Sequence, residues 1–197
     1  LSFLQTCLNS IREQTFSNYE IIIPDHSINN IIEQGLEEYK DLNIVHFYNA
    51  RGRGNSSINM NEGIKQATGD IIKIMHFDDF FCKKDTLEII YNKFNSSDLK
   101  WGLVGFNHLT FNKLGNVIIP SKTQWGNPSV SFFINNKLEP TYFDENLIWM
   151  NDHEIHTSLL KKYGDPIIIK DVCVTIKMHE DQVSKNLPHT RLEEEKN

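Results

Sequence analysis

The chain has 197 residues, of which 39% are hydrophobic and 23% charged, as expected for one globular domain with a substantial core. Its formal net charge of -6 argues against a general nucleic-acid-binding protein, because phosphate backbones are bound by basic surfaces. That charge is compatible with a small phosphate ligand held through a metal ion. No apolar run approaches the roughly 20 residues that a membrane span requires.

The three cysteines are Cys7, Cys82 and Cys173, which are odd in number and far apart in the sequence. Their spacing suggests neither a disulfide framework nor a structural zinc site. The first residues do not show the pattern of a signal peptide. A cytoplasmic location fits these features best, and peripheral association with a membrane stays open because it needs no span.

Strand and helix patterns alternate in the first half of the chain, which predicts a parallel α/β sheet. The expected elements are a helix over 1–14, a strand over 19–24, a helix over 28–39, a strand over 43–47, a helix from Ser56 or Ser57 to Ala67, a strand over 71–75 and a helix over 86–94. Ser56 and Ser57 are the expected capping residues of their helix.

The second half has a different pattern. We expect a hairpin in which strands over 101–111 and 116–120 flank a turn at Lys113-Leu114-Gly115. The later expected elements are a strand over 130–134, a helix over 151–163 that ends at Gly164, and strands over 167–169 and 172–178. No repeat or linker divides the chain, and the residues from Asn186 onward read as a polar tail.

The sharpest chemical feature is His76-Phe77-Asp78-Asp79, directly after the expected strand over 71–75. Ligands of open α/β sheets bind at the carboxyl ends of strands. Two adjacent carboxylates there repel each other unless a cation or solvent separates them, and their hard oxygens suit Mg²⁺ or Mn²⁺. Taken alone, the segment fits equally well a simple turn in which Asp79 caps the next helix.

Two other polar segments follow strands in the first half. Asp25-His26-Ser27 can accept hydrogen bonds from a base or a ribose, although a plain turn is the simpler interpretation. The loop over 49–55 contains glycines that permit close backbone approach, and its Arg51 and Arg53 could reach a diphosphate. It matches neither a Walker A loop nor Gly-x-Gly-x-x-Gly, and a flexible surface loop is its alternative reading.

Two candidates lie in the second half. Asp152 opens the helix over 151–163; with a reference pKa of about 3.9 it is ionised at neutral pH and can accept a proton. Its alternative role is a favourable acidic residue in a first helical turn. His179 follows the last strand and could bind a metal or a phosphate, although a lone histidine usually does neither.

The order of these motifs is more specific than any one of them. This order resembles that of the family 2 glycosyltransferases: a strand followed by Asp-x-Ser, then Asn-x-x-Gly, then the run over 61–70, and then a strand followed by x-x-Asp-Asp. Gly63-Ile64-Lys65-Gln66-Ala67-Thr68-Gly69-Asp70 is the most specific stretch. Residues 143–147, Asp152 and Gly164 are similar to the acceptor side of that family, and His179 with residues 182–184 is similar to its closing element. The resemblance runs from Leu8 to Ser184.

The resemblance implies a GT-A fold, an α/β, Rossmann-like three-layer sandwich with a mostly parallel central sheet, helices on both faces and an antiparallel hairpin in the second half. It implies one glycosyltransferase domain over 1–185. Within it, residues 1–100 form the nucleotide-sugar-binding half and residues 101–185 the acceptor-side half, and 186–197 form the tail.

The resemblance also assigns roles to residues. Asp25 contacts the nucleotide base, Asp152 is the catalytic base, and Mn²⁺ or Mg²⁺ is the implied cofactor. The metal ligands implied are Asp78, Asp79 and His179. The residues implied to contact or border the donor are Asp25, Ser27, Asn49, Gly52, Arg53, Asn61 and Asp78.

Three features depart from the family pattern. His76 stands where the first Asp of Asp-x-Asp is expected, and His26 stands where a second Asp often follows Asp25. The family's opening strand, which lines the base pocket, is absent before Leu1. These departures bear on metal preference and donor affinity more than on fold class.

The implied reaction is metal-assisted transfer of a sugar, with inversion, from a nucleoside-diphosphate sugar to a hydroxyl of a glycan, lipid or protein acceptor. A UDP-sugar is the favoured donor, polysaccharide or glycan biosynthesis is the implied setting, and a homodimer is left open. The alternative is a non-catalytic nucleotide-sugar-binding domain of a larger assembly. A sugar-phosphate nucleotidyltransferase is disfavoured, because the chain lacks a Gly-rich N-terminal loop that ends in Lys.

Overall fold

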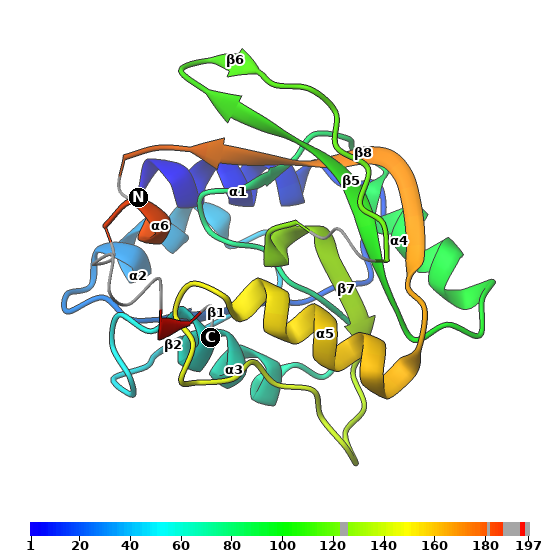
Figure 1. Ribbon diagram of the computed structural model, residues 1–197. Helices are drawn as coiled ribbons and strands as arrows, with labels where there is room; N and C mark the ends of the chain where they lie inside the picture. Colours follow the sequence, from blue (N-terminus) through cyan, green and yellow to red (C-terminus); the bar gives the residue numbers. More distant parts are fainter. Residues whose placement is uncertain (123–125, 181, 187–193, 196–197) are drawn as a thin grey trace.

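The computed structural model describes residues 1–122, 126–180, 182–186 and 194–195 (Figure 1). The first half contains α1 (Ser2–Arg12), β1 (Ile21–Asp25), α2 (Ile31–Leu36), the 3-10 helix η1 (Glu37–Tyr39), β2 (Ile44–Tyr48), α3 (Ser56–Gln66), β3 (Ile71–Lys73), β4 (Phe80–Phe81) and α4 (Thr86–Asn95). The second half contains β5 (Trp101–Thr110), β6 (Lys113–Leu114), the 3-10 helix η2 (Pro128–Val130), β7 (Ser131–Ile134), α5 (Asn151–Tyr163), β8 (Ile167–Met178) and α6 (Val183–Asn186). Most of the expected tail over 186–197 lies outside the described residues.

The described strands form two sheets. β1 and β2 pair in parallel, and a larger sheet has the order β3-β7-β5-β8-β4, with β6 added to β5. In the larger sheet β5 and β8 are parallel, whereas the other strand pairs are antiparallel. The α/β class is therefore confirmed, but the main sheet is mixed instead of mostly parallel. In the described part of the connection from β5 to β7 no crossover α-helix occurs, and the two strands pair antiparallel.

Two helices join the sheets. On α1, the carbonyl of Gln5 accepts a hydrogen bond from the Tyr39 hydroxyl at 3.3 Å, and the Ser10 hydroxyl accepts one from the Phe81 N–H at 3.0 Å. Asn59 of α3 donates to the carbonyl of Pro24 in β1 at 2.8 Å. Helix α1 therefore contacts both η1, which precedes β2, and β4 of the larger sheet, while α3 packs against β1.

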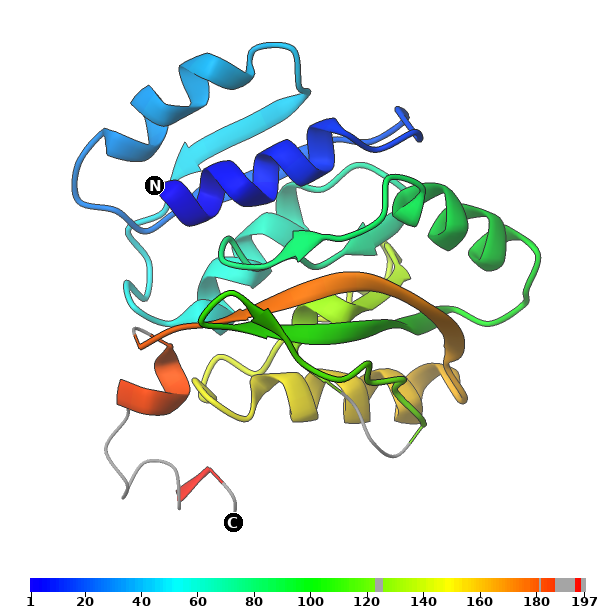
Figure 2. The ribbon, with the colours of Figure 1, turned by 90° about the horizontal axis from the view of Figure 1, so that it is seen from above.

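The core follows β5, whose residues from Trp101 to Asn107 are all buried. β5 and β8 run between α1 on one side and α5 on the other (Figure 2). The Trp101 indole N–H donates to the carbonyl of Gly164 at 2.8 Å, which ties β5 to the end of α5. None of the helices within the described residues is both long and apolar enough to span a membrane.

Three local expectations need correction. Asn55, and neither Ser56 nor Ser57, caps α3: its side chain accepts from the N–H of Ile58 at 3.1 Å. The β5–β6 turn lies at Phe111-Asn112, not over 113–115, because Thr110 pairs with Lys113. The two strands expected over 167–178 form the single strand β8, interrupted only by a bulge where its register against β5 shifts.

Candidate metal and donor site

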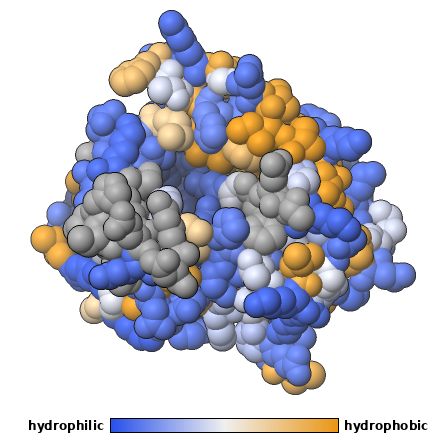
Figure 3. Space-filling view, viewed as in Figure 1, coloured by the Kyte–Doolittle hydropathy of each residue, from blue (hydrophilic) through white to orange (hydrophobic). Residues whose placement is uncertain are grey.

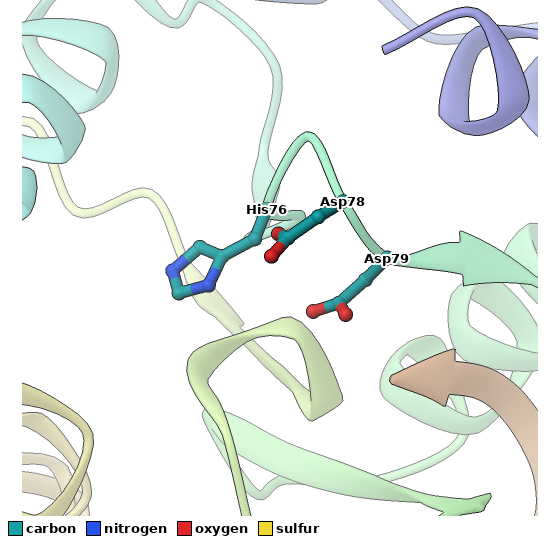
Figure 4. A group of neighbouring side chains, drawn as sticks. All are labelled: His76, Asp78 and Asp79. Carbon is teal, nitrogen blue, oxygen red and sulfur yellow. The ribbon is translucent and has the colours of Figure 1, made fainter. Parts of the chain in front are cut away.

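The loop over 76–79, here called the metal loop, connects β3 to β4 and gathers three potential ligands. One ligand atom from each of His76, Asp78 and Asp79 lies within 4.8 Å of the other two (Figure 4). A hydrogen bond of 3.1 Å from the Asp79 N–H to the His76 carbonyl closes the loop into a turn. This turn brings the two neighbouring carboxylates to the same side of the backbone (Figure 4).

Asp79 is the most buried member of the metal loop, with 1% of its surface exposed. Its Oδ1 accepts a hydrogen bond of 3.1 Å from the backbone N–H of Lys177 in β8. Its Oδ2 is buried and has no hydrogen-bond partner among the described residues. Burial, with the Asp78 carboxylate adding to it, raises the pKa of Asp79 to about 6. A cation bound at Oδ2 would stabilise the buried negative charge of Asp79.

The structure brings His179 to the metal loop, as the sequence predicts. Its Nε2 lies 2.8 Å from Oδ2 of Asp78, and both side chains are largely buried. The other ring nitrogen, Nδ1, is buried without a partner among the described residues. The ring of Phe3, at the start of α1, lies 4.7 Å from the His179 ring and covers one side of it. Helix α1 and the end of β8 therefore enclose the site.

His76 belongs to the same arrangement. Its backbone N–H donates to the Ser129 hydroxyl at 2.9 Å, and its Nε2 is buried without a partner in the described part of the chain. His76, Asp79 and His179 thus each leave one polar atom buried and unpaired. Such atoms are costly unless a ligand or water satisfies them. Carboxylate oxygens and imidazole nitrogens are metal ligands, so these residues fit a divalent cation.

Asp152 lies in the first turn of α5. Burial raises its pKa, and the nearby His153 and His76 act in the opposite direction. The effect of His76 on this pKa indicates that the Asp152 carboxylate lies within electrostatic range of the metal loop. Asn151 anchors the helix start, because its side chain donates to the Ser57 hydroxyl at 3.1 Å. The roles of Asp152 as base and of Asp78, Asp79 and His179 as metal ligands stay predictions.

Asp25 ends β1 and is 5% exposed. Its Oδ1 accepts a hydrogen bond of 2.7 Å from the Ser27 N–H, and its Oδ2 lies 3.0 Å from Nε2 of His46. Burial alone would raise the pKa of Asp25, but these hydrogen bonds outweigh it and hold the pKa below its usual value. Both carboxylate oxygens are thus engaged within the chain.

The loop over 49–55 packs against Asp25. The side-chain amide of Asn49 lies 3.1 Å from Nε2 of His26 and donates to Asn59 at 3.1 Å. Gly52 has a φ of +59°, and a Cβ there would come within 2.2 Å of the Ile58 side chain, so a larger residue would be strained at this position. Arg53 is exposed. The predicted contacts of Asn49, Gly52, Arg53 and Ser27 with a donor stay predictions.

The loop over 143–147 is clamped onto α3. Asn61, which is 2% exposed, donates to the Phe143 carbonyl at 2.9 Å and accepts from the Phe143 N–H at 2.8 Å. Arg51 forms a two-point ion pair with Glu145, with 2.8 Å between Nη1 and Oε1. This pairing lowers the pKa of Glu145 to about 2. Asn61 and Arg51 thus hold the segment that leads into α5, and a contact of Asn61 with a donor stays a prediction.

Sequence reasoning did not identify Lys73 and Ser129. Lys73 is half-buried in β3, where its ammonium donates to the carbonyls of Ile74 (2.6 Å) and Ser129. Burial lowers its pKa to about 7. A lysine inside the apolar run over 71–75 was an available signal for a special environment. No local pattern marks Ser129, because its contact with His76 spans 53 positions of sequence.

Solved structures with this fold were found by comparison. Staphylococcus aureus TarS 1–349 in complex with UDP-GlcNAc matches with a TM-score of 0.78 at 15% identity, over 95% of this chain and 58% of TarS. The same fragment with UDP matches with a TM-score of 0.75 at 15% identity, over 91% of this chain and 57% of the other. The mannosyltransferase PcManGT of Pyrobaculum calidifontis, in complex with GDP-Man and Mn²⁺, has a TM-score of 0.67 at 14% identity, over 93% and 55% of the two chains.

The sequence comparisons give the family. An uncharacterized glycosyltransferase of Mycoplasma genitalium is 33% identical over 89 residues, which cover 42% of this chain and 30% of that relative. The chain thus spans less than a third of this curated relative and slightly more than half of the solved structures. The family model described as glycosyl transferase family 2 matches residues 1–135. The chain therefore belongs to glycosyl transferase family 2, and its GT-A architecture agrees with that match.

Proposed function

We propose that this chain transfers a sugar from a nucleoside-diphosphate sugar to an acceptor hydroxyl, with help from a divalent cation and with inversion at the anomeric carbon. A UDP-sugar is the first donor to test, because TarS carries UDP or UDP-GlcNAc in structures that match this chain. The GDP-Man complex of PcManGT supports the wider class of nucleoside-diphosphate sugars.

Asp78, Asp79, His76 and His179 would hold the cation. When bound, Mn²⁺ or Mg²⁺ supplies positive charge against the departing nucleoside diphosphate. The chain itself contributes the arrangement of these ligands. The Lys177 N–H and the Ser129 hydroxyl bind Asp79 and the His76 backbone, so the metal loop is set before a ligand arrives.

Asp152 is the proposed general base. Its raised pKa keeps it basic enough to take a proton from an acceptor hydroxyl as that oxygen attacks the anomeric carbon. A single displacement of this kind breaks the bond to the diphosphate from the opposite face and inverts the configuration. Asn61 and Arg51 bind Phe143 and Glu145 in the segment before α5, and Asn151 at the start of α5 binds Ser57. These contacts would hold Asp152 in position for this step.

One observation carries the proposal: ligand atoms of His76, Asp78 and Asp79 lie within 4.8 Å of one another, and His76 and Asp79 each keep a buried polar atom without a hydrogen-bond partner among the described residues. The test is release of nucleoside diphosphate from UDP-sugars and GDP-sugars by the purified chain, with Mn²⁺, Mg²⁺ or a chelator. We expect steady release that depends on the cation and is lost in Asp79→Asn.

The same assay separates the alternative of a non-catalytic binding domain. Saturable binding of a donor and Mn²⁺ without release of nucleoside diphosphate, with or without acceptor sugars, would support that alternative. Cation-independent release that Asp79→Asn and Asp152→Asn leave intact would overturn the site assignment.

A further inference from the structure

The β5–β6 hairpin presents apolar side chains to solvent, away from the core. Phe111 is 85% exposed, Leu114 65% and Val117 57%. Ile118 and Ile119 continue the strip and are more than a third exposed. The hairpin projects beyond the body of the protein (Figure 1), and apolar side chains gather on the surface beside it (Figure 3). We call residues 111–119 the apolar hairpin.

The two residues at the tip of the apolar hairpin adopt a backbone conformation that is unfavourable for one of them, Phe111. Phe111 and Asn112 have φ values of +45° and +61°, and Thr110 pairs with Lys113 across them. A two-residue turn of this type favours Asn-Gly, because positive φ is unfavourable for a bulky side chain. Phe111 gains almost no burial in return, since it is 85% exposed. A strained and exposed aromatic residue points to a contact outside the chain.

The stretch of sequence that contains the apolar hairpin has the opposite charge to the whole chain. The chain carries a net charge of -6, yet no Asp or Glu occurs between Asp98 and Glu139. Lys113 is exposed next to the tip, and Lys122 follows the apolar strip, where it pairs with Asp165 at 3.1 Å. Farther along, Glu180 after β8 is neutralised by Lys185 at 2.8 Å. An apolar strip with a lysine and no carboxylate of its own suits an anionic lipid surface.

The shape of the apolar hairpin favours a lipid surface over a second copy of the chain. The hairpin is convex (Figure 1), so a protein partner would need a matching apolar groove. Two cavities of the described residues are lined largely by polar side chains, and neither offers such a groove: one is lined mainly by residues of α2, η1 and β2, the other mainly by residues of α5 with Glu195. A bilayer accepts a protruding apolar tip without any groove.

We propose that the apolar hairpin docks this protein onto an anionic lipid surface. Thr110 pairs with Met178 at the end of β8, and the next residue is His179 of the metal site. Docking therefore brings the site to the lipid surface. If the chain catalyses the proposed transfer, docking implies that its acceptor is carried in the membrane. The docking itself does not depend on the proposed transfer reaction.

The experiment is co-sedimentation of the purified chain with vesicles of phosphatidylcholine containing about one third phosphatidylglycerol. Phe111→Asn is the main variant, because Asn tolerates positive φ. We expect it to weaken vesicle binding by about tenfold or more, while its unfolding temperature stays unchanged or rises. Lys113→Glu should weaken binding to the anionic vesicles but not the residual binding to pure phosphatidylcholine.

Leu138→Ser is the matched control, since Leu138 is 94% exposed but lies outside the apolar hairpin; its binding should equal that of the wild type. The proposal is overturned if the wild type does not bind the vesicles, or if Phe111→Asn binds as well as the wild type. It is also overturned if Phe111→Asn disrupts a dimer in sedimentation while vesicle binding is absent. Release of nucleoside diphosphate without vesicles should be unchanged in Phe111→Asn, so docking and catalysis can fail separately.

Discussion

The loops that follow β1 and β3 are alike in composition but differ in how their polar atoms are used. Each places a histidine and an aspartate at the end of a strand. After β1, both oxygens of Asp25 are engaged, by the Ser27 N–H and by His46. After β3, His76 and Asp79 each keep one buried polar atom without a partner among the described residues. Buried groups left unpaired indicate a ligand site, whereas paired groups also serve as scaffold.

The acidities of the two aspartates show the same difference. Hydrogen bonds hold the pKa of Asp25 below its usual value despite burial. Burial and the neighbouring Asp78 raise the pKa of Asp79 to about 6. Asp25 is thus stabilised as an anion by groups of the chain itself, whereas burial disfavours the anionic form of Asp79, which a bound cation would stabilise.

The largest expected effect is that of Asp79→Asn. It removes the most buried negative charge of the metal loop at nearly constant size. If the unpaired atoms form a metal site, cation-dependent turnover should fall by more than about 10⁴-fold, because the charge stabilisation supplied by a metal is lost. Turnover is measured as nucleoside diphosphate released in Mn²⁺. Asp25→Asn is the matched comparison and should affect donor affinity more than metal dependence; equal loss of metal dependence in both would break the distinction between the loops.

Asp152→Asn is expected to have the next largest effect. Without a proton acceptor, transfer to an acceptor should slow by roughly 10²–10⁴-fold, while Mn²⁺ affinity stays unchanged. Single-turnover transfer and Mn²⁺ titration measure the two properties. Wild-type transfer rates in this variant would show that Asp152 is not the base.

The acidity of Asp79 predicts a pH dependence. The pKa of about 6 means that the folded, metal-free chain holds a proton on Asp79 up to about pH 6, whereas an ordinary aspartate has a pKa of 3.8. A cation must displace that proton, so Mn²⁺ affinity should fall by about tenfold per pH unit below pH 6 and level off above it. The same group makes the metal-free fold relatively more stable as pH falls from about 6 to about 4, because the folded state then binds more protons than the unfolded state. Titration of the wild type with Mn²⁺ at several pH values measures the first dependence. Chemical unfolding measures the second, which Asp79→Asn should flatten.

Asn61→Ala tests residues that are fully hydrogen-bonded within the chain, and we expect it to have the smallest effect on the metal site. It leaves the buried N–H and carbonyl of Phe143 without their partner, so we expect a loss of about 1–3 kcal/mol in the free energy of unfolding. Urea denaturation measures that loss. Donor affinity should change little; a large loss of affinity with unchanged stability would instead support direct contact between Asn61 and the donor.

The candidate ligands of the metal loop could be recognised from the sequence because they are contiguous, whereas metal binding by them stays a prediction. Residues 76–79 follow an apolar strand directly, and their order relative to the run over 61–70 indicated the family, which the family model confirms. His179 was predicted from the same resemblance, and the structure places it against Asp78. The supports of the loop could not be predicted, since Ser129 and the backbone of Lys177 are distant in sequence and carry no motif of their own.

Strand pairing and turn position were predicted less well. Gly115 suggested a turn over 113–115, but the chain turns at Phe111-Asn112 because the pairing of Thr110 with Lys113 determines the register. Alternation of strands and helices indicated a parallel sheet, whereas the antiparallel entry of β7 and β4 depends on long-range contacts. The division of the chain into halves at residue 100 stays a prediction.

Calorimetric titration of the metal-free chain with Mn²⁺ near neutral pH tests the central claim most directly, using the wild type, Asp79→Asn and Asn61→Ala. We predict one saturable site in the wild type, the same site in folded Asn61→Ala, and none in folded Asp79→Asn. Equal binding in all three proteins, or none in the wild type with or without a nucleoside diphosphate, would contradict the assignment of the metal loop.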